Sequence, residues 1–121
     1  MKTETLTGSA LDWAVAKAEG LKVGFVNTRN GPMPCIWEPS YEGDVDLPVP
    51  KYSTDWAQGG PIIERERISL RFWTNVTMVH AYTPNPREDD WASDPKSMLI
   101  AAMRAHVANK LGDEVDIPDN I

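Results

Sequence analysis

The sequence predicts an α+β domain in which helices cover one face of an antiparallel sheet of about four strands, arranged as two hairpins. Two segments with the apolar spacing of helices, about 8–19 and 95–111, lie near the ends of the chain. Between them are two pairs of short apolar or alternating segments, within 22–37 and 68–83. The strand–helix alternation and glycine-rich phosphate motif of doubly wound folds are absent from the sequence.

The composition is that of a small acidic globular protein. Its 121 residues suit a single domain, 1–121, and 41% of them are hydrophobic. The net charge of −6 argues against direct nucleic-acid binding and against an anionic membrane surface, since both favour Lys and Arg. No apolar run has transmembrane length, and the N-terminus lacks the apolar core of a signal peptide. We therefore expect a cytoplasmic protein with no membrane partner.

The first helix, at about 8–19, is predicted from a single apolar stripe. Its residues follow the spacing i, i+3, i+4 and i+7: Leu11, Ala14, Val15 and Ala18. Gly20 suits the position just after a helix, where the backbone often becomes left-handed. The pattern therefore predicts that the helix ends at this glycine.

The first hairpin is predicted from two short strands around a tight-turn signal. The strands are Lys22–Asn27 and Pro34–Trp37, and Asn30-Gly31 between them is typical of a two-residue turn. Proline cannot donate to a strand ladder, so the prolines of the second strand favour a place at a sheet edge or make the segment partly a loop.

Residues 38–51 and 84–93 are predicted to be polar surface loops, because both combine prolines with acidic residues. A loop as long as the first is either functional or a solvated connector. Between the two loops, 68–74 and 77–83 alternate in polarity around a short connection. These two segments predict the second hairpin.

The last helix is predicted over 95–111, with Asp94 as its N-cap, Pro95 at its first position and Gly112 closing it. Its apolar side is formed by Leu99, Ile100, Met103, Val107 and Leu111. A short helix is predicted at 61–67, because Pro61 is also suited to a first helical position.

The central stretch Tyr52–Glu66 reads YSTDWAQGGPIIERE and is the best site candidate. Before Pro61 it combines an indole, a carboxylate, hydroxyls and a carboxamide with a Gly-Gly break. An indole can stack on a polar ring compound, polar groups can read its donors, and glycine permits close approach to the backbone. The predicted ligand-binding residues are Ser53, Thr54, Asp55, Trp56, Gln58, Gly59 and Gly60, with Arg65 and Trp13 nearby. The alternative is a self-satisfied turn, whose polar side chains cap local amides while the indole fills the core.

No pattern in the sequence predicts catalysis, a metal site or a cofactor. Cys35 is the single cysteine, and the two histidines, His80 and His106, lack partners at a metal-ligand spacing. We therefore expect no catalytic residues, no metal and no cofactor. An enzyme that uses Asp12, Asp55 and a metal is the least favoured alternative.

Three parts of the chain contain the most distinctive residue patterns: residues 7–8 with 10–17, residues 52–66, and residues 99–104 with 110–115. They resemble the NinX-like family of short proteins from lambdoid bacteriophages and their prophages. The resemblance implies a phage accessory gene product expressed in the cytoplasm of a bacterial host. It implies no activity and supplies no catalytic residues.

Two functions of different classes are consistent with these features. The first is a non-enzymatic binding module for a small polar or nucleotide-like ligand, with a role such as counter-defence. The second is a protein-interaction module that inhibits or adapts a host factor through its acidic loops, at 42–46 and 88–90. A homodimer is a further expectation, because five tryptophans leave surface to bury.

Overall fold

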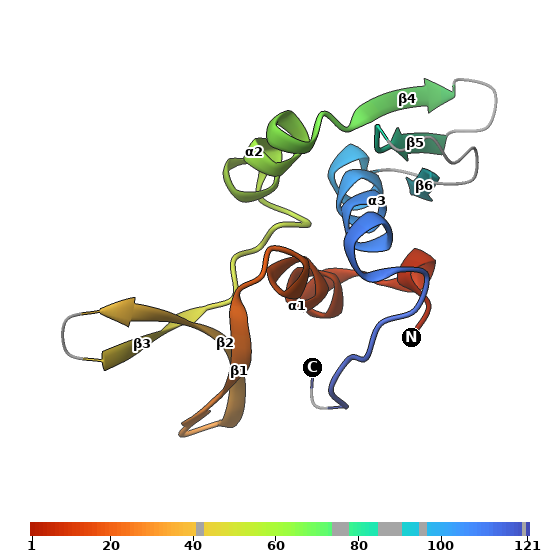
Figure 1. Cartoon of the computed structure of the whole chain (residues 1–121). Helices are drawn as coiled ribbons and strands as arrows, with labels where there is room; N and C mark the ends of the chain where they lie inside the picture. Colours follow the sequence, from red (N-terminus) through yellow and green to blue (C-terminus); the bar gives the residue numbers. More distant parts are fainter. Residues whose placement is uncertain (41–42, 74–77, 85–90, 95–96, 120) are drawn as a thin grey trace.

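The computed structural model describes residues 1–40, 43–73, 78–84, 91–94, 97–119 and 121. It confirms the α+β class (Figure 1). In chain order, the elements are the short 3₁₀ helix η1 (Thr3–Thr5), α1 (Gly8–Ala18), β1 (Lys22–Thr28), β2 (Gly31–Ser40), β3 (Gly43–Pro48), α2 (Trp56–Glu66), β4 (Ser69–Trp73), β5 (Met78–Tyr82), β6 (Trp91–Asp94) and α3 (Met98–Leu111).

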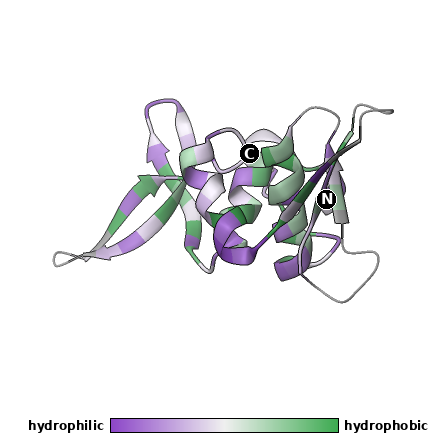
Figure 2. Ribbon diagram, turned by 90° about the horizontal axis from the view of Figure 1, so that it is seen from above, coloured by the Kyte–Doolittle hydropathy of each residue, from purple (hydrophilic) through white to green (hydrophobic). Residues whose placement is uncertain are grey.

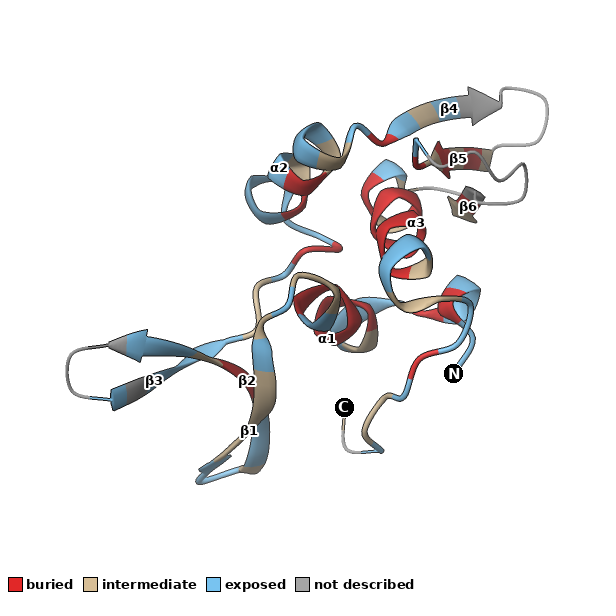
Figure 3. Cartoon of the chain, in the orientation of Figure 1, coloured by how far each residue is buried: buried red, intermediate tan, exposed pale blue. Residues whose placement is uncertain are grey.

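Helix α3 is the central element of the molecule. It packs against α1, α2, β4, β5, β6 and η1, and Figure 3 shows it as mostly buried. Its buried residues are Leu99, Ala101, Ala102, Met103, Arg104, Ala105, His106 and Val107. A helix that is apolar on most sides belongs in the interior of a fold. The alanines allow neighbouring elements to approach α3 closely, so the core forms around it.

The strands form two separate sheets, which corrects the predicted single sheet of about four strands. Each sheet is antiparallel and three-stranded among the described residues, with the orders β1-β2-β3 and β4-β5-β6. The missed strands are β3, inside the predicted 38–51 loop, and β6, at the end of the predicted 84–93 loop. Both are short and lie at sheet edges, where solvent can reach acidic side chains and where proline is tolerated. Their local composition therefore resembled that of loops.

Strand β2 is the central strand of its sheet, so the predicted edge position of this proline-rich segment was wrong. The register with β1 covers Gly31 to Trp37, and the register with β3 covers Cys35 to Ser40. Pro32 and Pro34 pair only with β1, and Pro39 pairs only with β3. Each proline therefore lies where β2 has one neighbour, and its missing N–H can face the open side.

Helix α2 begins at Trp56, five residues before the predicted start of the 61–67 helix. Asp55 is its N-cap, and Pro61 lies inside the helix on the exposed side. The Gly-Gly-Pro sequence therefore does not interrupt the helix, because a capping carboxylate and packing against α3 stabilise its first turns. The helix ends at Glu66, where Arg67 takes a left-handed conformation with φ of 53°.

Helix α3 begins at Met98, later than the predicted 95–111 helix. The Ser97 hydroxyl is the cap and accepts a hydrogen bond from the Ile100 amide at 3.1 Å. The predicted cap, Asp94, instead ends β6 and accepts from the Ser97 amide at 2.8 Å. The predicted first helical residue, Pro95, lies outside the described residues.

Strands β1, β2 and β3 form an arm that extends from the helical body. Strand β1 packs on α1, and in two views the β2–β3 hairpin runs away from the helices (Figures 1 and 2). The described residues of β3 are exposed along the strand. Strands β4 to β6 instead cover α3. The two sheets therefore differ in role, since only the second is fully part of the body.

The two ends of the chain pair with each other. The Thr3 amide donates to the Asp113 carbonyl at 2.8 Å, and the Val115 amide donates to the Met1 carbonyl at 3.0 Å. Val115 is buried. The acidic tail thus completes the core next to η1.

Candidate functional sites

The predicted ligand-binding residues divide into an exposed group and a buried group. The exposed group surrounds the start of α2 and includes Thr54, Asp55, Trp56 and Gln58. Trp56 keeps 53% of its surface exposed, so its ring does not fill the core. The Asp55 carboxylate accepts a hydrogen bond from the Ala57 amide at 3.0 Å and thereby caps the helix. The first turn of α2 therefore presents an indole to solvent with two polar side chains nearby in sequence.

Ser53 and Trp13 belong to the buried group. The Ser53 amide donates to Oδ1 of Asp12 at 2.8 Å. Burial raises the pKa of the Asp12 carboxyl, and the hydrogen bond from the Ser53 amide and the charge of Lys51 partly oppose this shift. Trp13 stacks on Phe25, with ring centroids 5.2 Å apart. Both predicted residues thus connect α1 to its neighbours.

The two predicted glycines have different surroundings in α2. A Cβ at Gly59 would overlap the Tyr52 carbonyl oxygen and the Leu99 side chain. A Cβ at Gly60 would meet Trp56 at 3.8 Å, an ordinary contact distance. The absent side chain of Gly59 therefore permits α2 to pack closely on α3.

Arg65, the last predicted site residue, belongs to an ion-pair network between helices. Its Nη1 and Nη2 donate to the two carboxylate oxygens of Glu19 at 2.9 and 2.6 Å, and its Nε donates to Glu66 at 3.1 Å. The other oxygen of Glu66 lies 3.8 Å from Nζ of Lys110. Nε2 of the fully buried His106 lies 3.2 Å from Glu19. The network ties the end of α1 to α2 and α3.

The charge states in this network follow from burial and from the paired geometry. Burial tends to raise the pKa of Glu19, but the hydrogen bonds and charges of Arg65 and His106 outweigh burial and lower it. Burial lowers the pKa of His106, against the opposite effect of Glu19. The structure therefore favours an ionised Glu19 beside a neutral imidazole. The guanidinium of Arg65 already has two carboxylate partners.

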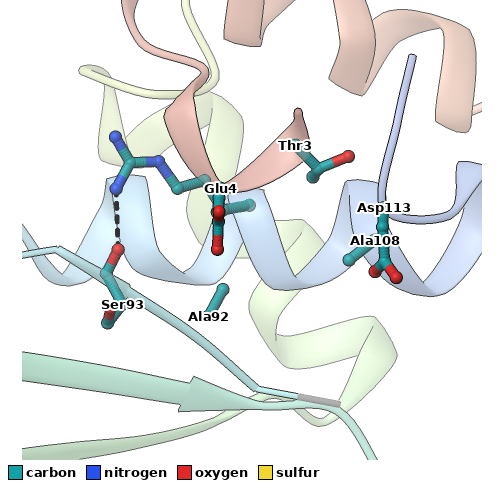
Figure 4. Close-up of a pocket in the computed structure, with 7 residues that line it drawn as sticks. Thr3, Glu4, Ala92, Ser93, Ala108 and Asp113 are labelled. Carbon is teal, nitrogen blue, oxygen red and sulfur yellow. Dashed lines mark hydrogen bonds between the residues drawn. The ribbon is translucent and has the colours of Figure 1, made fainter. Parts of the chain in front are cut away.

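A pocket of about 380 Å³ lies elsewhere, between η1, β6 and α3 (Figure 4). Its lining residues are Thr3, Glu4, Ala92, Ser93, Arg104, Ala108 and Asp113. Two carboxylates thus accompany one guanidinium. The pocket gave no signal in the sequence, because its residues come from the first helical turn, an unpredicted strand and the last helix.

Arg104 forms one wall of this pocket and holds three segments together. Its Nε donates to the Leu6 carbonyl at 2.9 Å, and its Nη1 donates to the Ser93 carbonyl at 2.7 Å. Nη1 also lies 3.3 Å from Oδ1 of Asp94. Burial lowers the pKa of the Arg104 guanidinium, and Asp94 opposes that shift. These contacts indicate a structural arginine.

The arm carries an exposed apolar and acidic surface that centres on β3. Val45 is 43% exposed and Leu47 is 37% exposed, and Asp46 between them is also exposed. Figure 2 shows hydrophilic and hydrophobic residues alternating along the arm. Exposed apolar side chains that lie together can form part of an interaction surface. Acidic residues within 42–46 were predicted from the sequence, but strand β3, which positions them, was not.

The described residues contain no group of three or more His, Cys, Asp or Glu side chains arranged to hold a metal ion. Among the described helices, none has the length and apolar character needed to cross a bilayer.

Comparison with protein families gives a match over most of the chain. The family model described as Bacteriophage P22, NinX matches residues 2–110. The chain belongs to the NinX family. It is accordingly a phage accessory protein, as the resemblance implied. A search of the curated proteins found no match to the chain.

The NinX match extends well beyond the three segments that suggested the resemblance. It includes the whole arm, α2, the second sheet and all but the end of α3. The arm therefore lies within the matched range. Membership itself assigns no activity to any of these elements.

Proposed function

We propose that this phage accessory protein is a non-enzymatic interaction module that binds a basic protein surface through its arm. The exposure of Val45 and Leu47 on β3 is the observation that carries the proposal. Two large apolar side chains on one short strand contribute little to the core when exposed, but they would bury surface against a partner.

The charge of the arm supports a basic partner. Asp46 is exposed beside the two apolar residues, and Glu38 pairs with Val45 across the hairpin and is also exposed. Acidic groups at an interface accelerate encounter with a basic surface and disfavour acidic competitors. A host protein that is inhibited or adapted in this way is the partner class that we propose.

Affinity capture from infected host lysate tests the proposal. Tagged wild-type protein is compared with a Val45→Ser/Leu47→Ser variant and with a Trp56→Ala variant. The proposal predicts a partner that the arm variant loses and the Trp56 variant retains. Equal recovery by the arm variant and the wild type would contradict it.

A second candidate function is a module for a small polar or nucleotide-like ligand at the start of α2. The exposure of Trp56 favours it, because an indole in solvent can stack on a planar ring. Against it, Ser53, Gly59 and Trp13 are buried, and the guanidinium of Arg65 is paired with Glu19. The ligand would therefore contact Thr54, Asp55, Trp56 and Gln58 alone.

Thermal-shift measurements with nucleotides and cyclic nucleotides test this second function. It predicts a rise in Tm with at least one compound, because a ligand that binds only the native state stabilises it. The rise should disappear in Trp56→Ala. A shift that persists without the indole, or no shift in the wild type, would contradict it.

A further inference from the structure

Strand β3 is an edge strand without a neighbour on its outer side among the described residues. The sheet order is β1-β2-β3, and the described residues of β3 are exposed. The outer main-chain amides and carbonyls of an edge strand are a template on which another strand can pair. Native edges are usually blocked by charges, prolines or bulges. Here Pro48 ends the strand and Asp46 places a charge within it, but Val45 and Leu47 stay exposed on the opposite face.

One row of side chains crosses the sheet and ends at this edge. Val23 pairs with Ile36, and Ile36 pairs with Leu47, so the three lie on one face. Ile36 is in the core and Val23 packs against the core, whereas Leu47 is 37% exposed. An additional strand next to Leu47 would continue the apolar row.

The neighbouring row lies on the opposite face and ends in a charge. Lys22 pairs with Trp37, and Trp37 pairs with Asp46. The Lys22 ammonium lies 5.7 Å from the centre of the Trp37 ring. Asp46 completes the row at the edge and is exposed. An additional strand that places a Lys or Arg beside Asp46 would continue this row with an opposite charge.

We propose that an extended segment of a basic partner protein adds to β3 as a fourth strand, with Lys or Arg alternating with apolar residues. The basic residues would lie beside Asp46, and the apolar residues would lie beside Val45 and Leu47. This inference rests on the proposed function, since it defines how the arm binds its partner. Successive residues of a strand point to opposite faces, so the alternation of β3 selects the same alternation in its partner.

The same alternation disfavours a second copy of the chain as the occupant. Pairing β3 with another β3 would bring acidic strands together, and like charges opposite one another destabilise a sheet. An expected homodimer would therefore form through another surface.

The test uses a labelled peptide of about eight residues in which Lys and Val alternate, with binding to the full chain followed by fluorescence anisotropy. Controls are a Glu–Val peptide and two N-methylated Lys–Val peptides, methylated on alternate sets of residues. One methylated set removes the amides that face β3, and the other set faces solvent. Strand addition predicts that one methylated peptide loses binding at least about tenfold while the other binds like the parent.

An Asp46→Lys variant gives the matched protein-side test. It should bind the Lys–Val peptide about fivefold more weakly and bind the Glu–Val peptide more tightly than the wild type does, because cross-strand charges are reversed. The exposed position of Asp46 makes unfolding of this variant unexpected, and circular dichroism checks its fold.

The outcomes separate strand addition from the proposed function. If both methylated peptides bind like the parent, strand addition is overturned while a charged interaction surface remains. If the parent peptide does not bind, or binds Asp46→Lys and Val45→Ser/Leu47→Ser as it binds the wild type, strand addition is overturned, and the affinity capture alone then decides the proposed function. Self-association that Asp46→Lys alters would overturn the basic partner in favour of a second copy.

Discussion

At the scale of single residues, two buried polar side chains connect distant parts of the chain. His106 lies in the middle of α3, fully buried, and its Nε2 meets Glu19 at the end of α1. Its Nδ1 is also buried and has no hydrogen-bond partner among the described residues. Protonation of this ring would place a charge in the interior, with Glu19 as its nearest compensation. The imidazole therefore makes stability sensitive to pH.

The free energy of unfolding should fall between pH 7.5 and 5.5 more steeply in the wild type than in His106→Gln. Burial lowers the folded pKa of His106 below 6.5, so the unfolded state takes up the proton first as the pH falls. The stability that the neutral His106 contributes above pH 6.5 is therefore lost as the pH falls below that value. The extra loss grows with the distance by which the folded pKa of His106 lies below 6.5. Urea titrations at the two pH values measure it, and parallel losses would contradict the prediction.

Arg104→Lys should destabilise the protein by about 1–3 kcal/mol, although the charge is conserved. The guanidinium donates hydrogen bonds to the carbonyls of Leu6 and Ser93 from two different nitrogens. The single ammonium of lysine cannot reproduce that geometry. Buried carbonyls without donors account for the loss. Guanidinium chloride unfolding measures it. An unchanged midpoint and slope would show that the contacts are dispensable.

At the scale of secondary-structure elements, locally encoded features were predictable and pairing-dependent ones were not. The stripe of α1, the Asn30-Gly31 turn signal and the β4–β5 alternation are local features of neighbouring residues. The structure confirms α1 and the β1–β2 and β4–β5 pairs, but the turn residues between β1 and β2 are Arg29 and Asn30, and Gly31 pairs with Thr28. Strands β3 and β6 exist because β2 and β5 pair with them, and no local pattern reveals that pairing.

The candidate site shows the same division. The exposure of Trp56 and the cap at Asp55 were within reach of sequence reasoning, because both are local to the start of α2. The burial of Gly59 depends on Leu99 in another helix, so it could not be predicted from the local sequence. Arg104 did have a signal, since it is spaced between Ile100 and Val107 like a residue of the buried stripe.

Gly59→Ala and Gly60→Ala should change stability in opposite directions. The new methyl group at position 59 would overlap the Tyr52 carbonyl and Leu99, so α2 would move away from α3 at a cost of about 1–3 kcal/mol. At position 60 the methyl group would lie at an ordinary van der Waals distance from Trp56. Alanine there should stabilise the helix by about 0.5–1 kcal/mol. Thermal unfolding of the pair is the measurement. Equal effects would contradict the close packing of α2 on α3 at Gly59.

At the scale of the whole molecule, the chain consists of a body closed around α3 and an arm that adds little to the core. The body joins both termini through main-chain pairing, and the second sheet covers α3. In the arm, Ile36 belongs to the core, whereas β3 lies beyond it. The residues that match the NinX family model, 2–110, include β3.

The Val45→Ser/Leu47→Ser variant should keep its free energy of unfolding within about 0.5 kcal/mol of the wild type, as expected for surface substitutions. Ile36→Ser is the matched control on the same row and should be severely destabilised, because Ile36 is buried in the core. Denaturant titration compares the three proteins. A large loss in the double variant would make β3 part of the core.

Site-specific photocrosslinking in infected cells tests the interaction surface most directly. A photoreactive residue in place of Leu47 on the arm is compared with one in place of Lys17, an exposed position on α1. We predict a discrete crosslinked product with a basic protein from position 47 and none of that size from position 17. No product from position 47, or the same product from both positions, would contradict the arm as a binding surface.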